Sequence, residues 1–275
     1  MPKCYGYKKS RQIRNIRIFW TKSSFSRINY VLKGFRLKDV FETIKERKSV
    51  RVPFDPNRPI SKENLEHILE AARWAPTGHN MQNYEIMVVD DRAVLGRISS
   101  IKSCVLEDFL RDSYRHLSFS EEELKHKKTG ILSTGFPPDW VDPAKFSQIA
   151  RSPPIPISNS IRGSPTLLMV LYDPRKKAPA LAVDIYGFIG LGCLMENIWL
   201  TAQALGISMQ ILSLSATVSV EEELKQLLDI PDPLKIAYTI RLGYPTIPAP
   251  AKDLRVRRDI GDFTHHNRYS QKGLQ

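Results

Sequence analysis

The sequence is poor in the residues that build disulfides and metal sites. It contains only three cysteines in 275 residues, Cys4, Cys104 and Cys193, and they are far apart. This number and spacing indicate neither a disulfide framework nor a metal site. Of the six histidines, only His265 and His266 are adjacent, with no cysteine or carboxylate at ligand spacing. We therefore expect no bound metal and a reducing compartment, the cytoplasm.

The sequence also lacks a recognisable set of protein catalytic groups. No Ser-His-Asp, Cys-His or paired-carboxylate arrangement can be assigned. Gly190-Leu191-Gly192 lacks the third glycine and the preceding strand of a dinucleotide-binding fingerprint. We therefore predict no catalytic side chain and expect a cofactor to carry the chemistry.

Acidic residues are absent from the N-terminal part of the chain. Residues 1–38 contain eleven of the 41 Lys and Arg residues, so thirty basic and 29 acidic residues remain beyond them. The net charge of +12 is thus concentrated in this leader. This basic leader has four interpretations: a targeting segment, a nucleic-acid-binding arm, a disordered tail, or the product of a start codon assigned too early. Nothing else favours nucleic acid, and we predict that residues 1–36 form a flexible basic extension.

One long apolar run has the length of a membrane span. It covers residues 185–205, but Glu196, Asn197 and Gln203 argue against a membrane. Its small residues would let another helix approach closely. The run therefore predicts a helix buried on all sides.

Two short motifs have the composition of a flavin site. Arg47-Lys48-Ser49-Val50-Arg51 combines three cations and a hydroxyl, which suits a phosphate dianion. Asn80 and Gln82 each carry a donor and an acceptor, which suits the mixed edge of an isoalloxazine ring. Alone, the first motif would suit a solvated face and the second an ordinary loop.

The order of these motifs resembles the nitroreductase family of FMN-dependent oxidoreductases. That family typically has Arg-Arg-Ser-x-Arg after a helix, then Ala-Pro-Ser-x-x-Asn-x-Gln-Pro-Trp before a strand. The similar pieces here are 46–51, 68–82, 86–89, Leu242-Gly243-Tyr244-Pro245, 257–259 and 265–269. The resemblance spans roughly residues 37–269 and predicts one FMN-binding domain over 37–270, with 271–275 as a tail.

The resemblance implies a homodimer and assigns most of the candidate site. Phosphate contacts are expected from Arg47, Ser49 and Arg257, with help from Arg255. Lys48 and Arg51 suit the ribityl chain, ring edge or phosphate. Asn80 and Gln82 should face the ring or ribityl hydroxyls, with Pro76 and Thr77 from the neighbouring subunit. The backbone near flavin N5 corresponds to Ile211, Leu212 and Ser213.

Two departures from the family pattern stand out. Asn83-Tyr84 replaces the usual Pro-Trp after Gln82, so the path of that loop is open. Residues 210–214 lack the glycines common near flavin N5. We therefore expect a flavin environment and redox potential that differ from those of typical members.

The expected fold is α+β of a three-layer type, with a mixed, mostly antiparallel sheet flanked by helices. Ser61 suits a helix N-cap, and Ser120 with Glu123 and Ser219 with Glu222 resemble capping boxes. Strands are expected at 85–89, 166–172, 210–214 and 236–242. The Pro-rich stretch 130–164 is either a surface loop or a substrate lid with Phe136, Trp140 and Phe146.

The predicted function is transfer of hydride from NADH or NADPH, through FMN, to a small planar acceptor such as a nitroaromatic or quinone. One alternative is a flavoenzyme of the same fold that uses NAD(P)H poorly, such as a dehalogenase or oxidase. Another is a flavin-binding regulatory protein whose basic leader binds nucleic acid.

Overall fold

The computed structural model describes residues 31–32, 35–36, 40–177, 179, 184–213, 218–248 and 255–271. The chain divides into two units, Met1–Leu37 and Lys38–Gln275. In the first unit, β1 (Val31–Leu32) pairs antiparallel with β2 (Phe35–Arg36). Most of the predicted basic extension lies outside the described residues.

A four-stranded antiparallel sheet forms the centre of the second unit. Its order is β3 (Tyr84–Val89), β8 (Thr166–Tyr172), β10 (Lys235–Gly243) and β9 (Ser208–Leu212). The β8 sequence, Thr-Leu-Leu-Met-Val-Leu-Tyr, is apolar without alternation because its side chains are buried on both faces of the sheet.

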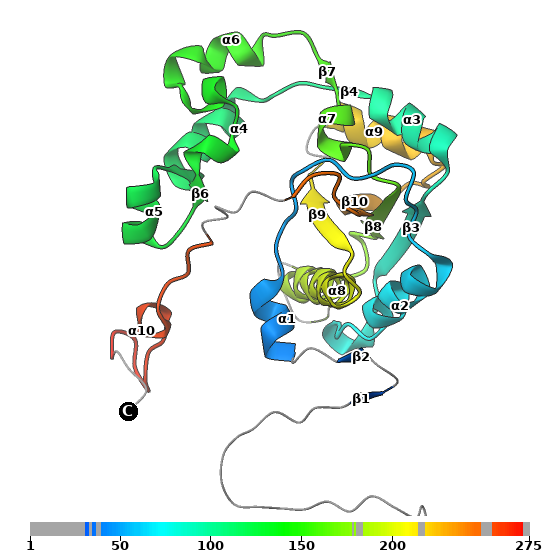
Figure 1. Ribbon diagram of the computed structural model, residues 1–275, viewed down its shortest axis with the longest axis horizontal. Coiled ribbons are helices and arrows are strands. Elements are labelled where there is room, and N and C mark those ends of the chain that lie inside the picture. The colour runs from blue at the N-terminus through cyan, green and yellow to red at the C-terminus, as the bar shows by residue number, and fades with distance from the viewer. Residues whose placement is uncertain are drawn as a thin grey trace, which may run out of the picture. The chain divides into compact units, whose positions relative to one another are not determined.

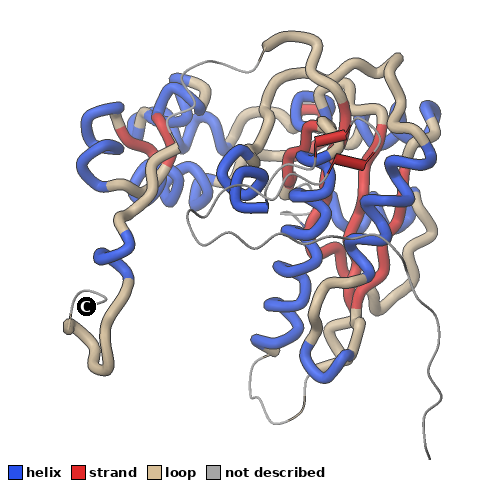
Figure 2. Tube along the Cα trace, turned by 60° about the horizontal axis from the view of Figure 1, so that its bottom comes forward, coloured by secondary structure: helices blue, strands red, loops and turns tan. Residues whose placement is uncertain are grey.

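Helices cover both faces of this sheet (Figures 1 and 2). Leu168 and Val170 of β8 belong to a core with α2 (Lys62–Arg73) and α8 (Ile185–Ala204). Leu167 and Met169, which point to the other face, belong to a core with α3 (Arg92–Ser100) and α9 (Val218–Leu227). This arrangement confirms the predicted three-layer α+β fold.

The remaining elements are short and connect or extend these layers. α1 (Val40–Glu46) precedes α2 in the sequence, and the 3₁₀ turn Gly78–Asn80 follows α2. The stretch between α3 and β8 contains β4 (Lys102–Ser103), α4 (Glu107–Asp112), a π-helical turn (Ser113–Leu117), β5 (Ser118–Phe119), α5 (Glu121–Lys127), β6 (Ile131–Leu132), 3₁₀ turns at Ser133–Gly135, Pro138–Val141 and Pro143–Lys145, α6 (Phe146–Ala150), β7 (Ile155–Pro156) and α7 (Ser158–Ile161). α10 (Ile260–Phe263) lies near the C-terminus.

Two of the three predicted helix starts are confirmed. The Ser61 side chain accepts a hydrogen bond from the Asn64 amide, and Ser120 with Glu123 forms a complete capping box. The Ser219 prediction is wrong because α9 already begins at Val218. Val220 and Leu224, four residues apart on one face of this helix, are fully buried.

The prediction that α8 is buried on all sides is wrong for the single chain. Only 39% of its most apolar 18-residue window is buried, and Ile185, Tyr186, Phe188 and Ile189 are exposed. α8 is also long and apolar enough to cross a membrane, but one side packs on α2 and the sheet as in a core helix. Because the exposed side of α8 is apolar as well as the buried side, its apolar residues show no helical periodicity.

Candidate functional site

The segment from Ser49 to Phe54 presents alternate residues to the core. Val50, Val52 and Phe54 are buried and contact one another. A strand places successive side chains on opposite faces, so Ser49 and Arg51 share the other face. Ser49 forms a parallel bridge to Met209 of β9, and the Val50 amide donates to the Met209 carbonyl at 2.9 Å. The hydroxyl and one predicted cation are thus side by side along the edge of β9.

The predicted N5 residues lie at the end of that same strand. Ile211 is partly buried, Leu212 is buried in the core beneath α9, and Ser213 follows the strand at the surface. Met209, the partner of Ser49, precedes Ile211 by two residues. The structure therefore brings the Arg47–Arg51 motif beside the segment expected near flavin N5.

Arg47 packs against α8. Its Nε lies 3.1 Å from the Glu196 carboxylate, and its guanidinium lies 4.5 Å from the centre of the Trp199 ring. The Trp199 indole donates to the Lys48 carbonyl at 3.3 Å. The Arg47 Nε is buried and makes no aligned hydrogen bond within the described residues. The charge of Arg47 is thus partly neutralised by Glu196.

The two C-terminal arginines have different surroundings. Arg255 donates from Nη1 to the carbonyls of Lys45 and Arg47, at 2.8 and 2.9 Å. Arg257 is exposed, and its Nη1 donates to the Val256 carbonyl at 2.8 Å. Arg255 thus attaches the 255–257 segment to the end of α1, next to the first motif.

The second motif forms a tight loop at the end of α2. The backbone N–H of Gln82 donates a hydrogen bond to Thr77 Oγ1 at 3.1 Å. The side-chain Nε2 of Gln82 donates to Asn80 Oδ1 at 3.0 Å. His79, Asn80 and Gln82 all have positive φ angles, between 45° and 54°. Such backbone is strained for residues with a side chain and is concentrated at functional sites.

This loop contacts α8 through Thr77. A β-carbon added at Gly190 would lie 3.2 Å from the Thr77 Cγ2 atom. The Asn197 amide, on the same side of α8, donates to the Ala71 carbonyl at 2.9 Å. Pro76 is exposed beside this contact. The absence of a side chain at Gly190 therefore permits the close approach of the loop.

α8 separates the two motifs within one chain. Gly190, which contacts the Thr77 loop, and Trp199, which contacts Arg47, are nine residues apart. At 3.6 residues per turn they point to opposite sides of the helix, about 180° apart. Figure 1 shows α8 between α1 and α2, in agreement with this. One chain does not bring the phosphate motif and the amide loop onto one surface.

The predicted lid is part of a small folded lobe that begins at α4. Trp140 packs edge-on against Phe109 at 6.0 Å between ring centres, and Phe146 packs against Tyr114 at the same distance. Phe146 is only 5% exposed, whereas Phe109 and Tyr114 are 47% and 42% exposed. Phe136 is half-buried. In this chain Phe146 is therefore an internal packing residue of the lobe.

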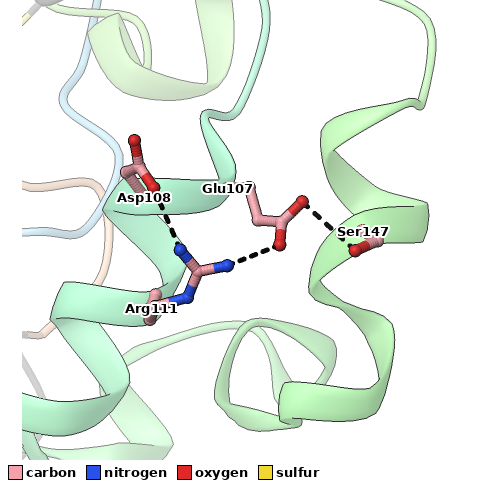
Figure 3. Close-up of polar contacts among 4 residues, drawn as sticks. All are labelled: Glu107, Asp108, Arg111 and Ser147. Atoms are coloured by element: carbon pink, nitrogen blue, oxygen red, sulfur yellow. Dashed lines mark hydrogen bonds and ion pairs between the residues drawn. The ribbon is translucent and has the colours of Figure 1, made fainter.

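Polar contacts link α4 to α6 within the lobe (Figure 3). Glu107 accepts from Arg111 at 2.7 Å and from the Ser147 hydroxyl at 3.1 Å, while Asp108 also accepts from Arg111 at 3.1 Å. These contacts join α4, which carries Phe109, to α6, which carries Phe146.

Sequence reasoning missed Arg241, which lies in the middle of β10. Its side chain is fully buried and donates to the carbonyls of Val50 and Val52, both at 2.8 Å. A single charged residue in the otherwise uncharged run 236–242 was the available signal. Burial, with a smaller effect of Arg162, lowers the pKa of Arg241 to about 10, so this guanidinium is charged at neutral pH.

Two of the surface hollows in the described part of the chain are well defined, and predicted site residues line neither of them. The larger, of about 410 Å³, lies beside α9. The other, of about 320 Å³, lies between α8 and β10.

Known proteins resemble this chain over most of its length. The sequence model described as "Nitroreductase family" matches residues 44–244. The iodotyrosine deiodinase of Thermotoga neapolitana is 24% identical over 217 residues, which cover 78% of this chain and 92% of that protein. An NADPH-dependent oxidoreductase of Staphylococcus epidermidis is 30% identical over 101 residues, which cover 34% of this chain and 39% of that protein.

Solved structures show the same fold. A nitroreductase with bound FMN from Bacteroides fragilis has a TM-score of 0.52 and 22% identity, over 82% of this chain and 98% of that one. A nitroreductase family protein from Clostridium difficile 630 has a TM-score of 0.54 and 16% identity, over 84% and 99%. Because the family match covers well over half of the sequence, the chain belongs to the nitroreductase family.

Proposed function

We propose that this protein is an FMN-dependent oxidoreductase that takes electrons from NADH or NADPH and reduces a small planar acceptor. The observation that supports this most is the shared face of Ser49 and Arg51 beside β9, with Arg255 attached to Arg47 nearby. A bound flavin would supply two-electron transfer between donor and acceptor. The protein would supply binding, orientation and exclusion of water.

The residues fit FMN in chemical type. Ser49, Arg51 and Arg257 offer a hydroxyl and two exposed cations for a phosphate dianion. Arg47 would contribute through its terminal nitrogens, while its Nε lies 3.1 Å from the Glu196 carboxylate. Asn80 and Gln82 offer amides for the polar edge of the ring. Asn83 stands where the family pattern has proline. Its side-chain Nδ2 is buried and has no hydrogen-bond partner in the described residues.

These residues can surround one flavin only if two chains combine. Because α8 lies between the phosphate motif and the Thr77 loop, the loop of a second copy must complete each site. The exposed apolar residues Ile185, Phe188 and Ile189 give α8 a suitable surface for that copy. We therefore propose a homodimer with composite sites, as closed two-fold symmetry would produce.

A reductive dehalogenase is the second candidate. The match to an iodotyrosine deiodinase over 92% of that protein's length favours it. The exposed rings of Phe109 and Tyr114 on the lobe could stack on a halogenated ring as readily as on a nitroaromatic or quinone. Such a reaction consumes two electrons and a proton and releases halide.

Anaerobic rapid mixing distinguishes the candidates. The FMN-loaded protein is mixed with NADPH or NADH, and the reduced protein is then mixed with a quinone, a nitroaromatic or a halogenated phenol. Fast reduction by NAD(P)H and fast reoxidation by the quinone or nitroaromatic support the first proposal. The second proposal is supported if NAD(P)H reduces the protein slowly and the dithionite-reduced protein releases halide from the halogenated phenol. A protein that takes up no flavin contradicts both.

A further inference from the structure

Arg241 is a buried cation whose partners are all neutral. Its side chain is fully buried in β10. It donates to the Gln210 side chain at 2.8 Å, to the Ile161 carbonyl at 3.2 Å and to the carbonyls of Val50 and Val52. The guanidinium also stacks on Phe54 at 4.0 Å. Within the described part of the chain it contacts no carboxylate. A buried charge without an opposite charge is costly, so the neutral groups that Arg241 holds are where its role is to be sought.

The geometry of Arg241 depends on the register of the 49–52 segment. Val50 and Val52 are two residues apart, so their carbonyls point to the same side of an extended strand. Arg241 Nη2 contacts both carbonyls, while its Nε is held by Gln210 on the neighbouring strand β9. Arg162 donates to the Arg51 carbonyl, which faces the other way. The two arginines therefore hold both edges of the segment.

A shift of this segment by one residue would change the candidate site completely. Because side chains alternate along a strand, such a shift would turn Ser49 and Arg51 inward and the two valines outward. In the described residues the segment has one bridge at each end, Ser49 to Met209 and Phe54 to Pro245, but no continuous ladder between them. The fork of Arg241 adds a register constraint between these two bridges, at Val50 and Val52.

We propose that Arg241 is a positioning residue for the phosphate end of the cofactor site, because it fixes the 49–52 segment with Ser49 and Arg51 on the ligand-facing side. This inference rests on the proposed function and assigns a role to a residue that does not touch the cofactor. A lysine cannot take this role because its single nitrogen lacks the planar fork that reaches Gln210 and both valine carbonyls.

The test compares FMN with riboflavin, which lacks the phosphate. Dissociation constants for both ligands are measured by flavin fluorescence for the wild type, Arg241→Lys and Leu224→Ala. Leu224 is a fully buried residue of α9, and its truncation serves as a control for lost stability. We expect Arg241→Lys to lower the riboflavin-to-FMN ratio of dissociation constants about tenfold, and Leu224→Ala to leave it unchanged.

A milder variant covers the case in which Arg241→Lys does not fold. Gln210→Met removes one acceptor of Arg241 at similar volume and should lower the same ratio by a smaller factor. An unchanged ratio in a folded Arg241→Lys protein, or in Gln210→Met if the former is unfolded, would overturn the inference. A wild type that binds neither ligand would instead contradict the proposed function.

Discussion

The guanidinium of Arg255 donates a hydrogen bond to the backbone carbonyl of Arg47 at 2.9 Å, although the two residues are 208 positions apart. A second bond from the same nitrogen reaches the Lys45 carbonyl. Carbonyls at the end of a helix lack intrahelical donors, so a cation is favourable there. This contact makes the C-terminal arginines and the first motif parts of one surface.

Replacing Arg255 should therefore weaken cofactor binding without direct loss of a phosphate contact. Arg255→Met removes the bonds to Lys45 in α1 and to Arg47 just after it, and frees the segment that carries Arg257. We expect FMN affinity to fall about tenfold, as for loss of a hydrogen bond to a charged group. Calorimetric titration measures it. Arg258→Met is the matched control, since Arg258 is an exposed neighbour whose one contact among the described residues is stacking on Phe263 at 5.5 Å. Equal FMN affinities for the two variants would show that the contacts of Arg255 with Lys45 and Arg47 do not contribute to FMN binding.

Arg47 and Glu196 should differ in their effects even though they form one ion pair. Arg47→Ala removes a predicted phosphate contact and should weaken FMN binding about ten- to a hundredfold. Glu196→Gln leaves that cation in place and should mainly lower stability, by about 0.5–1 kcal/mol for a partly exposed pair. Thermal unfolding and FMN titration of both variants separate the effects. If Arg47→Ala retains FMN through dialysis, Arg47 does not hold the phosphate.

The close contact at Gly190 predicts a specific cost for an added methyl group. In Gly190→Ala the new β-carbon meets Thr77 at 3.2 Å, so the amide loop must shift by a few tenths of an ångström. We expect weaker FMN binding, despite a gain in helix propensity of about 1 kcal/mol. Gly96→Ala in α3 is the control, because nothing lies within 4 Å of its added carbon, and it should raise thermal stability alone. Unchanged FMN affinity in Gly190→Ala would remove the loop from the site.

The exposed side of α8 should be required for both dimerisation and flavin binding. Ile189→Lys places a charge in the proposed contact and should give monomers that bind FMN poorly, because each site would lose the second chain's loop. Ile247→Lys is the control, because Ile247 is 53% exposed and Ile189 is 52% exposed. Ile247 lies outside α8, so this variant protein should remain dimeric. Sedimentation velocity and FMN titration report the two properties. A monomeric wild type with full FMN affinity would disprove the composite site.

The sequence predicted the sheet and its helices well where local signals were strong. The apolar run of β8 and the caps at Ser61 and Ser120 were sufficient for their elements. The motif order was sufficient for the family. Ser219 misled because a serine followed three residues later by glutamate also occurs inside a first helical turn, and α9 is already helical at Val218.

The candidate site was less accessible from the sequence because its geometry depends on distant contacts. The role of Arg241 requires knowing that β10 lies beside the Val50 segment, 191 positions away. The lobe was missed as a unit because its packing joins α4 to residues after 130. Roles of individual site residues, the homodimer and the cytoplasmic location stay predictions.

The most direct test of the central claim is an anaerobic absorbance titration of the purified, FMN-supplemented wild type with NADPH and with NADH. We expect the two visible bands of an oxidised flavin, one FMN per chain after removal of excess cofactor, and bleaching of both bands by one equivalent of nucleotide per chain. A folded protein that stays colourless after incubation with FMN would contradict the assignment of this chain as an FMN-dependent oxidoreductase.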